Sequence, residues 1–317
     1  MEITLPVLIA DDMHASLMEG LERLDIPFLY MPEASRTEVL ALLPKCQGLV
    51  VRSKLLVDRE VLAQAGNLLF IARAGSGMDN VDEPFAQSKG IICLNAPEGN
   101  RDAVGEHAAG LLLGLIRNIP RAFDEVKQGL WLREENRGEE LTEMTVGIIG
   151  YGNTGQAFAH KISGFGCRIL YYDKNFIDVP TSFAKPALLR EVYDQADVLS
   201  FHIPLDEENK GLINHSLIAS VARPFYLLNL SRGGIMNTPD ILRGLESGKI
   251  KAAALDVLEN EKPHTWNEGE SLMLQRMIDT KRVILTPHIG GWTTASYRRI
   301  SEVLLAKIES LLSQDEI

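Results

Sequence analysis

The sequence predicts an α/β protein of two lobes, each built around a parallel β-sheet, with the second sheet doubly wound. The first reason is length, because a chain of 317 residues exceeds the roughly 250–300 residues at which a single hydrophobic core stops growing. The second is that short β-rich runs alternate with amphipathic segments along most of the chain. The third is a glycine-rich turn near the middle, where a strand pattern passes directly into a helix pattern.

The first hundred residues form the first strand–helix series. Their β-rich runs are separated by amphipathic segments of helical spacing, and strands that alternate with helices pair in parallel. We therefore expect one parallel sheet here. The expected strands are 6–10, 28–31, 48–52, 68–73 and 91–95, and the expected helices are 18–24, 37–43, 59–65 and 83–90.

Residues 101–126 are predicted to form one long helical stretch that is apolar nearly all round in its middle. Such a helix must be covered on every side. Periodicity alone leaves two coverings open, namely the interior between the lobes and a second copy of the chain.

A second strand–helix series begins at Thr145. Six strands in this part of the chain match a doubly wound dinucleotide-binding domain, whereas a barrel would need eight repeats. The last segment carries apolar residues on one helical face, and we expect it to pack on the first lobe. The expected strands lie near 145–150, 168–173, 197–203, 225–230, 251–257 and 283–286, and the apolar face comprises Tyr297, Ile300, Leu304, Ile308 and Leu311.

The segment "GIIGYGNTGQAFAH", residues 147–160, has the order strand, glycine-rich turn, helix that a dinucleotide fingerprint requires. Gly150 would permit the tight turn, Gly152 would let the backbone approach a pyrophosphate, and Gly155 would let the helix pack on the strand. The first helical residues, Asn153 and Thr154, would offer N–H groups to the phosphates. An ordinary glycine turn is the alternative interpretation.

Asp173 ends the next strand, 18 residues after Gly155. A dinucleotide-binding domain places an acidic residue about 20 residues on, where it binds the ribose hydroxyls. Because a carboxylate repels a 2′-phosphate, this position favours NAD over NADP. The adjacent Lys174 weakens the preference.

Polar residues follow the strands of the second lobe at their carboxyl ends, where ligands bind in open α/β sheets. An arginine, a glutamate and a histidine in that place suit hydride transfer between a nicotinamide and a 2-hydroxy or 2-oxo acid. Arginine binds a carboxylate with two donors, histidine exchanges a proton near neutral pH, and a carboxylate beside it raises its pKa. Taken singly, each has a structural alternative as a helix cap, a solvated loop acid or a core histidine. The residues are His202, Ser231, Arg232, Asp256, Glu261 and His288.

The first lobe has polar strand ends of its own. Gly75, Ser76 and Gly77 follow a strand directly, and their successive N–H groups could form a nest for a carboxylate. Arg52 and Ser53 follow another strand. A simple turn is the alternative for the glycines.

Composition narrows the function classes. The formal net charge of −11 disfavours a nucleic-acid partner. No apolar run is long enough for a membrane span, and no basic leader precedes an apolar stretch at the start, so a cytoplasmic location is expected. The three cysteines are far apart and form no CxxC pair, so we expect neither a disulfide framework nor a metal site.

The chain resembles the D-isomer-specific 2-hydroxyacid dehydrogenase family over nearly its whole length. The resemblance is carried by "VVRS", "ARAGSGMDNVD", "TVGIIGYGNTGQAFA", "SFHIPL", "LLNLSRGGIMN", "AAALDVLENE" and "TPHIGG". It implies a flavodoxin-like substrate domain formed by residues 1–99 and 289–317, and a Rossmann NAD-binding domain formed by residues 100–288. It also implies a homodimer made largely through the helix after Asn100.

The resemblance implies roles for particular residues. Arg232 would bind the substrate and polarise its carbonyl, His288 would be the acid/base, and Glu261 would be its partner. Asp256 would hold the nicotinamide carboxamide. The implied cofactor contacts further include His202, Pro204, Ser231 and Gly290, and the implied substrate contacts are Arg52, Ser53, Gly75, Ser76, Gly77 and Asn100.

Within the family the chain looks most similar to phosphoglycerate dehydrogenases, and Arg52 and Lys54 would suit a substrate phosphate. Glyoxylate/hydroxypyruvate reductases and D-lactate dehydrogenases are the alternatives within the enzyme class. An NAD(H)-sensing, corepressor-like binding protein is the alternative outside it. Two departures from the family stand near the site: Lys262 follows Glu261 where many relatives have proline, and Trp292 occupies a position where relatives often have a small polar residue.

Overall fold

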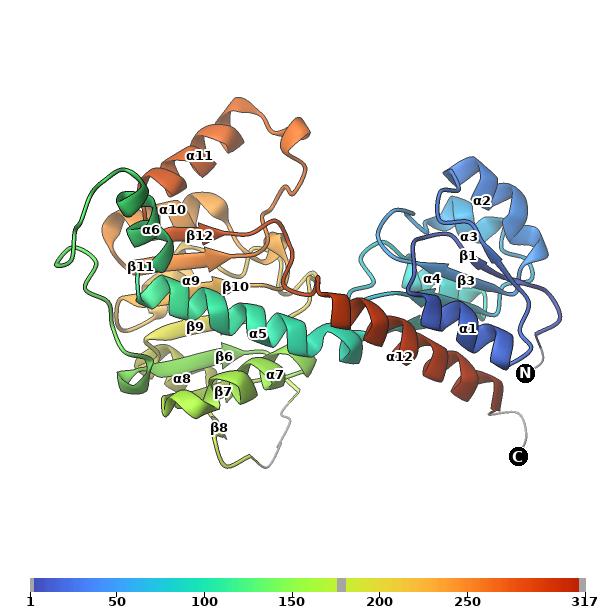
Figure 1. Cartoon of the computed structure of the whole chain (residues 1–317), viewed down its shortest axis with the longest axis horizontal. Helices are drawn as coiled ribbons and strands as arrows, with labels where there is room; N and C mark the ends of the chain where they lie inside the picture. The colour runs from blue at the N-terminus through green and yellow to red at the C-terminus, as the bar shows by residue number, and fades with distance from the viewer. Residues whose placement is uncertain (1–2, 176–180, 314–317) are drawn as a thin grey trace. The chain divides into compact units, whose positions relative to one another are not determined.

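A computed structural model describes residues 3–175 and 181–313 (Figure 1). The contacts divide the chain into two compact units, and the boundaries lie within a few residues of the expected ones. The first unit comprises residues 1–101 and 292–317, and the second unit comprises residues 102–291.

The first unit contains a five-stranded parallel sheet in the order β2-β1-β3-β4-β5. This is the flavodoxin-like order, so the predicted fold of this part is confirmed. Each expected strand is present and slightly shorter than its apolar run. The strands are β1 (Val7–Ile9), β2 (Phe28–Tyr30), β3 (Gly48–Val51), β4 (Phe70–Arg73) and β5 (Ile92–Asn95).

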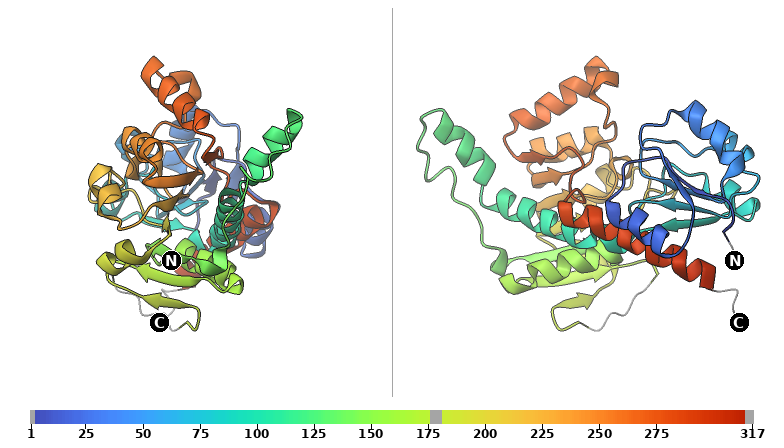
Figure 2. Two further views of the ribbon diagram at one scale, coloured as in Figure 1. Left: turned by 90° about the vertical axis from the view of Figure 1, so that its left-hand side faces the viewer. Right: turned by 45° about the vertical axis from the view of Figure 1, so that its right-hand side comes forward.

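Helices cover both faces of this sheet. One face packs against α1 (Ala15–Arg23) and α12 (Thr294–Ser313), which lie side by side (Figures 1 and 2). Ile300, Leu304 and Ile308 of α12 are buried there, which confirms that the last segment packs on the first unit. The other face packs against α2 (Arg36–Leu42), α3 (Arg59–Ala63) and α4 (Glu83–Ser88), and a 3-10 turn, η1 (Leu43–Lys45), follows α2.

The described part of the second unit contains a seven-stranded parallel sheet in the order β12-β11-β10-β9-β6-β7-β8. Counted from β6, this is the dinucleotide-binding order 3-2-1-4-5-6 with one further strand. The short edge strand β8 was not predicted, because three residues ending in proline carry no alternation. The strands are β6 (Thr145–Ile149), β7 (Arg168–Tyr172), β8 (Ala184–Pro186), β9 (Val198–Phe201), β10 (Phe225–Asn229), β11 (Ile250–Leu255) and β12 (Val283–Leu285).

Two buried clusters hold the helices against this second sheet. One face packs on α5 (Pro97–Ile116) and α7 (Asn153–Ile162). The other face packs on α8 (Leu189–Gln195), α9 (His215–Ser220), α10 (Thr238–Ser247) and α11 (Glu268–Asp279). The 3-10 turns are η2 (Leu141–Glu143), η3 (Ser163–Phe165), η4 (Gly233–Ile235) and η5 (Pro263–Thr265).

The single helical stretch predicted at 101–126 is wrong, because the structure divides it into α5 and α6 (Ile119–Lys127). Asn118 interrupts it with a φ of 54°, a left-handed conformation that asparagine tolerates better than most residues. Pro120 follows in the first turn of α6, where its missing N–H costs no hydrogen bond. The apolar residues of α5 pack into the core of the second unit.

The helix α6 and the residues after it present large apolar side chains to solvent. The exposed residues are Ile119, Phe123, Val126, Leu130 and Trp131, with Phe123 64% and Trp131 78% exposed. Of the helices in the part of the chain that the structure describes, none combines the length and apolar character of a membrane span.

Candidate active site

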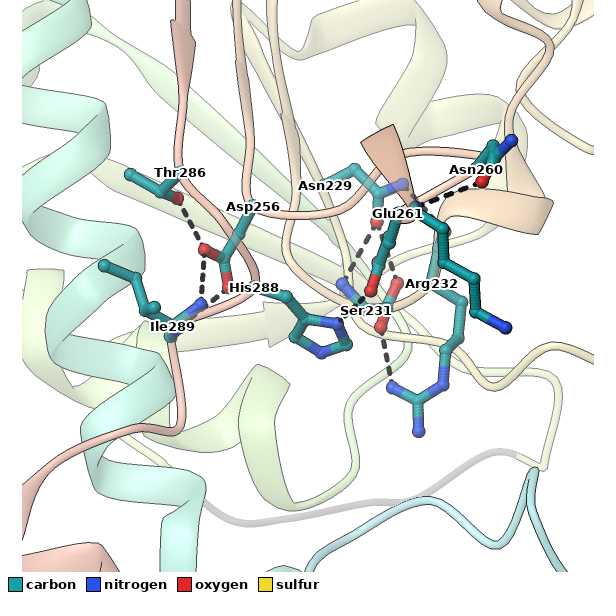
Figure 3. Close-up of polar contacts among 11 residues, drawn as sticks. Asn229, Ser231, Arg232, Asp256, Asn260, Glu261, Thr286, His288 and Ile289 are labelled. Carbon is teal, nitrogen blue, oxygen red and sulfur yellow. Dashed lines mark hydrogen bonds and ion pairs between the residues drawn. The ribbon is translucent and has the colours of Figure 1, made fainter. Parts of the chain in front are cut away.

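Three neighbouring strands of the second unit carry polar residues just past their carboxyl ends. Arg232 follows β10, Asp256 follows β11, and His288 follows β12. Glu261 lies farther along the loop that leaves β11. Figure 3 shows the His288 ring between Asp256 and Arg232, with the Glu261 carboxylate beside it. The structure therefore brings together the arginine, glutamate and histidine that the sequence singled out.

Arg232 lies in a turn that its neighbours fix in place. The buried Asn229 side chain donates to the Arg232 carbonyl over 3.0 Å and accepts from the Ser231 N–H over 3.1 Å. At the next residue, a Cβ on Gly233 would lie 1.8 Å from the Leu258 carbonyl oxygen. Only glycine fits there, so the arginine loop packs directly on the loop that leads to Glu261.

His288 and Glu261 form a close pair. Nδ1 of His288 lies 2.8 Å from Oε2 of Glu261, and the histidine backbone adopts a φ of 55°. When Nδ1 donates to the carboxylate, Nε2 of the ring is the atom left to exchange a proton with a substrate. The His288 side chain is 44% exposed and the Glu261 side chain is 41% exposed.

The charges around His288 favour its protonated form. The hydrogen bond with Glu261 is the largest effect and raises the pKa of His288, and the Glu261 and Asp256 charges raise it further. Burial and the Arg232 charge act in the opposite direction, but the net result is a pKa above the ordinary value of histidine. The imidazolium is therefore stabilised, as an acid near neutral pH requires.

Asp256 is only 1% exposed, and its carboxylate is occupied by protein donors. The Ile289 N–H donates over 2.9 Å and the Gly290 N–H over 2.7 Å, and Thr286 donates through its hydroxyl. Burial alone would raise the pKa of Asp256, but these hydrogen bonds and one from His107 lower it below its ordinary value. Asp256 thus fixes the start of the loop that carries His288. A direct contact with the nicotinamide remains a prediction.

His107 is a site residue that the sequence analysis missed. Its Nε2 lies 3.1 Å from the Thr286 hydroxyl and 3.4 Å from Asp256, so α5 supports the same carboxylate. A histidine within an otherwise apolar helical stretch was the available signal.

In the glycine-rich turn, two of the three glycines stand where the fold leaves no room for a side chain, and the third does not. Gly150 has a φ of 90°, and a Cβ there would lie 2.4 Å from the His202 carbonyl oxygen. A Cβ on Gly155 would lie 2.1 Å from the Gly150 carbonyl oxygen. A Cβ on Gly152, at the start of α7, would meet no described atom within 4 Å. The open space at the N-terminus of a helix fits the approach of a pyrophosphate.

The acidic residue after β7 also fits a dinucleotide. Asp173 accepts from the Tyr151 N–H over 2.8 Å, which ties it to the glycine-rich turn. The neighbouring Lys174 lies 2.9 Å from Glu208 and 3.6 Å from Asp206. Those acids thus engage the lysine charge, and a preference for NAD over NADP remains a prediction. The ribose contact itself remains a prediction.

His202, predicted to contact the cofactor, uses its ring to hold α7. Its Nε2 lies 2.8 Å from the Ser200 hydroxyl, and its Nδ1 lies 3.3 Å from the Thr154 hydroxyl. Burial lowers the pKa of His202 to about 4, so the ring is neutral near pH 7. Pro204 lies exposed just beyond His202.

The substrate-binding residues predicted in the first unit form a group of their own. The Ser76 hydroxyl donates to Asn100 over 2.6 Å. Asn80 donates to the Arg52 carbonyl over 2.9 Å, which ties the Arg52–Ser53 loop to the segment that follows the glycine loop. Gly75 has a φ of 149°, which is compatible with the alternative interpretation of these glycines as a simple turn.

Trp292 contacts Arg52 instead of filling the core. The Arg52 guanidinium lies 4.4 Å from the centre of the Trp292 ring and 5.1 Å from that of Tyr297. Trp292 is 68% exposed. In contrast, the Lys54 ammonium donates to the Pro32 carbonyl over 2.9 Å. Arg52 is therefore the better placed of the two cations to meet an anionic group.

The chain is similar to known proteins over most of its length. A model of the D-isomer specific 2-hydroxyacid dehydrogenase NAD-binding domain matches residues 109–290. The chain is 35% identical over 275 residues to a hydroxypyruvate reductase of Thermotoga maritima, covering 86% of this chain and 87% of that one. It is 34% identical over 298 residues to a D-3-phosphoglycerate dehydrogenase of Sus scrofa, covering 93% of this chain and 54% of that one. It thus spans about half the length of that dehydrogenase.

The fold has a close match among solved structures. The crystal structure of the TT0316 protein from Thermus thermophilus superposes with a TM-score of 0.82 at 26% identity, covering 98% of this chain and 97% of that one. The similarity therefore includes both units.

Proposed function

Because this chain belongs to the D-isomer-specific 2-hydroxyacid dehydrogenase family, as an NAD-binding oxidoreductase that acts on a CH–OH group, we propose that it uses Arg232, Glu261 and His288 to interconvert a D-2-hydroxy acid and its 2-oxo acid. One observation carries the proposal: the 2.8 Å contact between His288 and Glu261, with Arg232 on the neighbouring loop.

Each residue has a distinct chemical task. In oxidation, His288 Nε2 removes the hydroxyl proton of the substrate, and Glu261 stabilises the imidazolium that forms. The Arg232 guanidinium orients the substrate carboxylate and polarises the C2 oxygen. In reduction, the His288 imidazolium returns the proton to that oxygen.

The cofactor would be held by the turn between β6 and α7. The backbone at Gly152 and the first N–H groups of α7 would bind the pyrophosphate, and Asp173 would bind the adenosine ribose. Bound NAD supplies the hydride acceptor for oxidation, and its reduced form supplies the hydride for reduction. We expect NAD to be preferred over NADP.

The first candidate substrate is 3-phosphoglycerate. Its support is Arg52, whose guanidinium lies over the Trp292 ring at 4.4 Å from its centre and carries N–H donors around the edge of its own plane. These donors suit a phosphate group. A phosphorylated substrate is also named in the D-3-phosphoglycerate dehydrogenase to which the chain is similar.

The second candidate is the pair hydroxypyruvate and glycerate. It is favoured by the relative from Thermotoga maritima, which this chain matches over most of both sequences. Arg52 would then meet an uncharged hydroxyl instead of a phosphate. The two substrates therefore predict different consequences of losing the arginine charge.

A substrate panel with NADH tests both proposals. The purified protein is mixed with NADH and 3-phosphohydroxypyruvate, hydroxypyruvate, glyoxylate or pyruvate, and the loss of NADH absorbance is followed. Turnover of the phosphorylated acid that falls sharply in Arg52→Gln supports the first candidate. Turnover of hydroxypyruvate that is insensitive to this change supports the second. Tight NADH binding without any turnover would favour an NAD(H)-sensing binding protein instead.

We also propose that the protein is a homodimer. Its support is the cluster of exposed apolar side chains on α6 and the residues after it, because a soluble protein rarely leaves such a patch uncovered. The interface was expected largely on the helix after Asn100, but the apolar residues of α5 already pack into the second unit. The proposed interface is therefore α6 and residues 128–131.

A further inference from the structure

Glu261 lies on the most exposed loop of the site. Residues 261 to 265 are all exposed, and this loop connects β11 to α11. A solvated glutamate on a free loop would lose considerable conformational entropy when held beside a histidine. The 2.8 Å contact with His288 therefore requires that the backbone at Glu261 is fixed by other residues.

Asn260 fixes the backbone immediately around Glu261. Its side-chain carbonyl accepts from the Lys262 N–H over 3.1 Å. Its amide nitrogen donates to the Thr265 hydroxyl over 3.0 Å and to Glu270 over 3.2 Å. The residue before Glu261 thus binds the residue after it and also the first turn of α11.

Trp266 and Thr265 complete these contacts. The indole Nε1 of Trp266 donates to the Asn260 carbonyl over 2.9 Å. The Thr265 hydroxyl and N–H donate to the Lys262 carbonyl over 2.8 and 2.9 Å. Peptide groups on both sides of Glu261 therefore have partners within the loop. We call Asn260, Thr265, Trp266 and Glu270 the Asn260 network.

The network is anchored in the second unit through α11. Asn267 caps this helix by accepting from the Glu270 N–H over 2.9 Å, and Glu270 accepts from the Asn267 N–H over 2.8 Å. Farther along the helix, Met277 is fully buried. One Glu270 carboxylate thus joins the helix cap to Asn260.

A pocket of about 280 Å³ borders this loop, and Leu258, Asn260, Trp266 and Met273 are among its lining residues. Asn260 and Trp266 therefore adjoin open space on one side, and the hydrogen bonds described above hold them on the other.

Lys262 contributes its backbone to the same arrangement. Asn260 accepts from the Lys262 N–H over 3.1 Å, and a proline at this position would have no N–H to donate.

We propose that Asn260 and Trp266 are positioning residues, which hold Glu261 beside His288 and act on the reaction only through it. This proposal rests on the roles given above to Glu261 and His288. The charged groups that face His288 are Glu261, Arg232 and Asp256. The Asn260 network holds the peptide groups on both sides of Glu261, so changes in the network should reach His288 through Glu261.

The test measures the ionisation of His288 in the intact protein, without cofactor or substrate. Histidine is labelled with ¹³C and ¹⁵N, the His288 signal is assigned by its loss in His288→Gln, and its pKa is read from the shifts against pH. We expect Glu261→Gln to lower this pKa by about 1 unit or more. Trp266→Phe keeps an aromatic side chain but removes the indole N–H donor. It should lower the pKa by a fraction of that amount, as should Asn260→Ala.

A double variant and a control make the result specific. Trp266→Phe should cause no further shift in a Glu261→Gln background, because the two changes act through one residue. Gln275→Ala removes another hydrogen bond of α11, the one to Asp279, and should leave the pKa of His288 unchanged. In turnover, Trp266→Phe should lower kcat more than it changes the NADH dissociation constant.

The outcomes separate the two proposals. If Glu261→Gln lowers the pKa of His288 but Trp266→Phe and Asn260→Ala do not, the positioning role is wrong. If Trp266→Phe lowers the pKa equally with and without Glu261, the network does not act through the glutamate and the proposal fails. If every pKa shift appears as expected but no 2-oxo acid is turned over, the network is real and the proposed function is wrong.

Discussion

The chemistry of the site depends on a few charged atoms whose neighbours set their protonation. The hydrogen bond with Glu261 raises the pKa of His288, and Asp256 uses buried hydrogen bonds to fix the loop that begins at Thr286. His202 shows the opposite case, because burial keeps its ring neutral. His202 and His288 both follow strands of the same sheet, but their surroundings shift their pKa values in opposite directions.

His288→Ala should lower kcat by roughly 10² to 10⁴, the range typical of removing a general acid or base. The dissociation constant of NADH should remain nearly unchanged, because no residue of the glycine-rich turn is altered. Steady-state kinetics and a fluorescence titration with NADH measure the two quantities. Equal losses of turnover and NADH affinity would instead indicate a structural histidine.

Glu261→Gln should move the pH dependence of the reaction to lower pH. Reduction requires the protonated His288, so kcat/KM for a 2-oxo acid falls as the pH rises through the pKa of this residue. Glu261 raises that pKa, and its removal must move the fall downward. Oxidation requires the neutral ring, so its rise with pH should move downward as well. A pH profile that does not move, or moves upward, would contradict the pairing.

Glycines of the turn between β6 and α7 show how an element encodes both fold and binding. Gly150→Ala should destabilise the protein, because a non-glycine residue in such a conformation costs roughly 1–3 kcal/mol and its Cβ would lie against the His202 carbonyl. Gly152→Ala should leave the free energy of unfolding nearly unchanged but weaken NADH binding. Urea denaturation and NADH titration of both variants measure this. Equal behaviour of the two variants would argue against a pyrophosphate at Gly152.

Elements were predicted well where an apolar pattern was long. The expected strands of both sheets are present, since buried parallel strands need continuous apolar runs. The edge strand β8 was not predicted because its three residues show no hydropathy pattern. The break before α6 was not predicted because it depends on the left-handed backbone of Asn118, which hydropathy does not indicate. The Asn260 network was not predicted for another reason. Hydrogen bonds among loop residues depend on the path of the backbone, which the spacing of residues in the sequence does not specify.

At the scale of the whole molecule, the chain forms the first unit from its two ends and the second from its middle. The arginine, glutamate and histidine of the proposed reaction all come from the second unit. The sequence motifs predicted that these residues lie together, because the carboxyl ends of parallel strands meet at one edge of their sheet. Assembly was harder to predict, since an apolar helix can serve the core of its own unit, as α5 does, or a partner.

Phe123→Glu combined with Trp131→Glu should convert the proposed dimer into a single copy. Charges placed in an apolar interface remain unpaired, which costs more than the interface gains. Sedimentation equilibrium measures the mass in solution. Phe165→Glu, which alters an exposed aromatic residue elsewhere in the second unit, should leave the mass unchanged. A wild-type mass equal to that of one chain would contradict the proposed assembly.

The most direct test of the proposed reaction follows the hydride itself. The protein is given a 2-oxo acid that it turns over and NADH with deuterium at the transferring position of nicotinamide C4. Mass spectrometry and chiral chromatography then analyse the product. The account predicts a D-2-hydroxy acid with deuterium at C2, and a large loss of its rate of formation in His288→Ala. A product without the label, or of the L configuration, would contradict it.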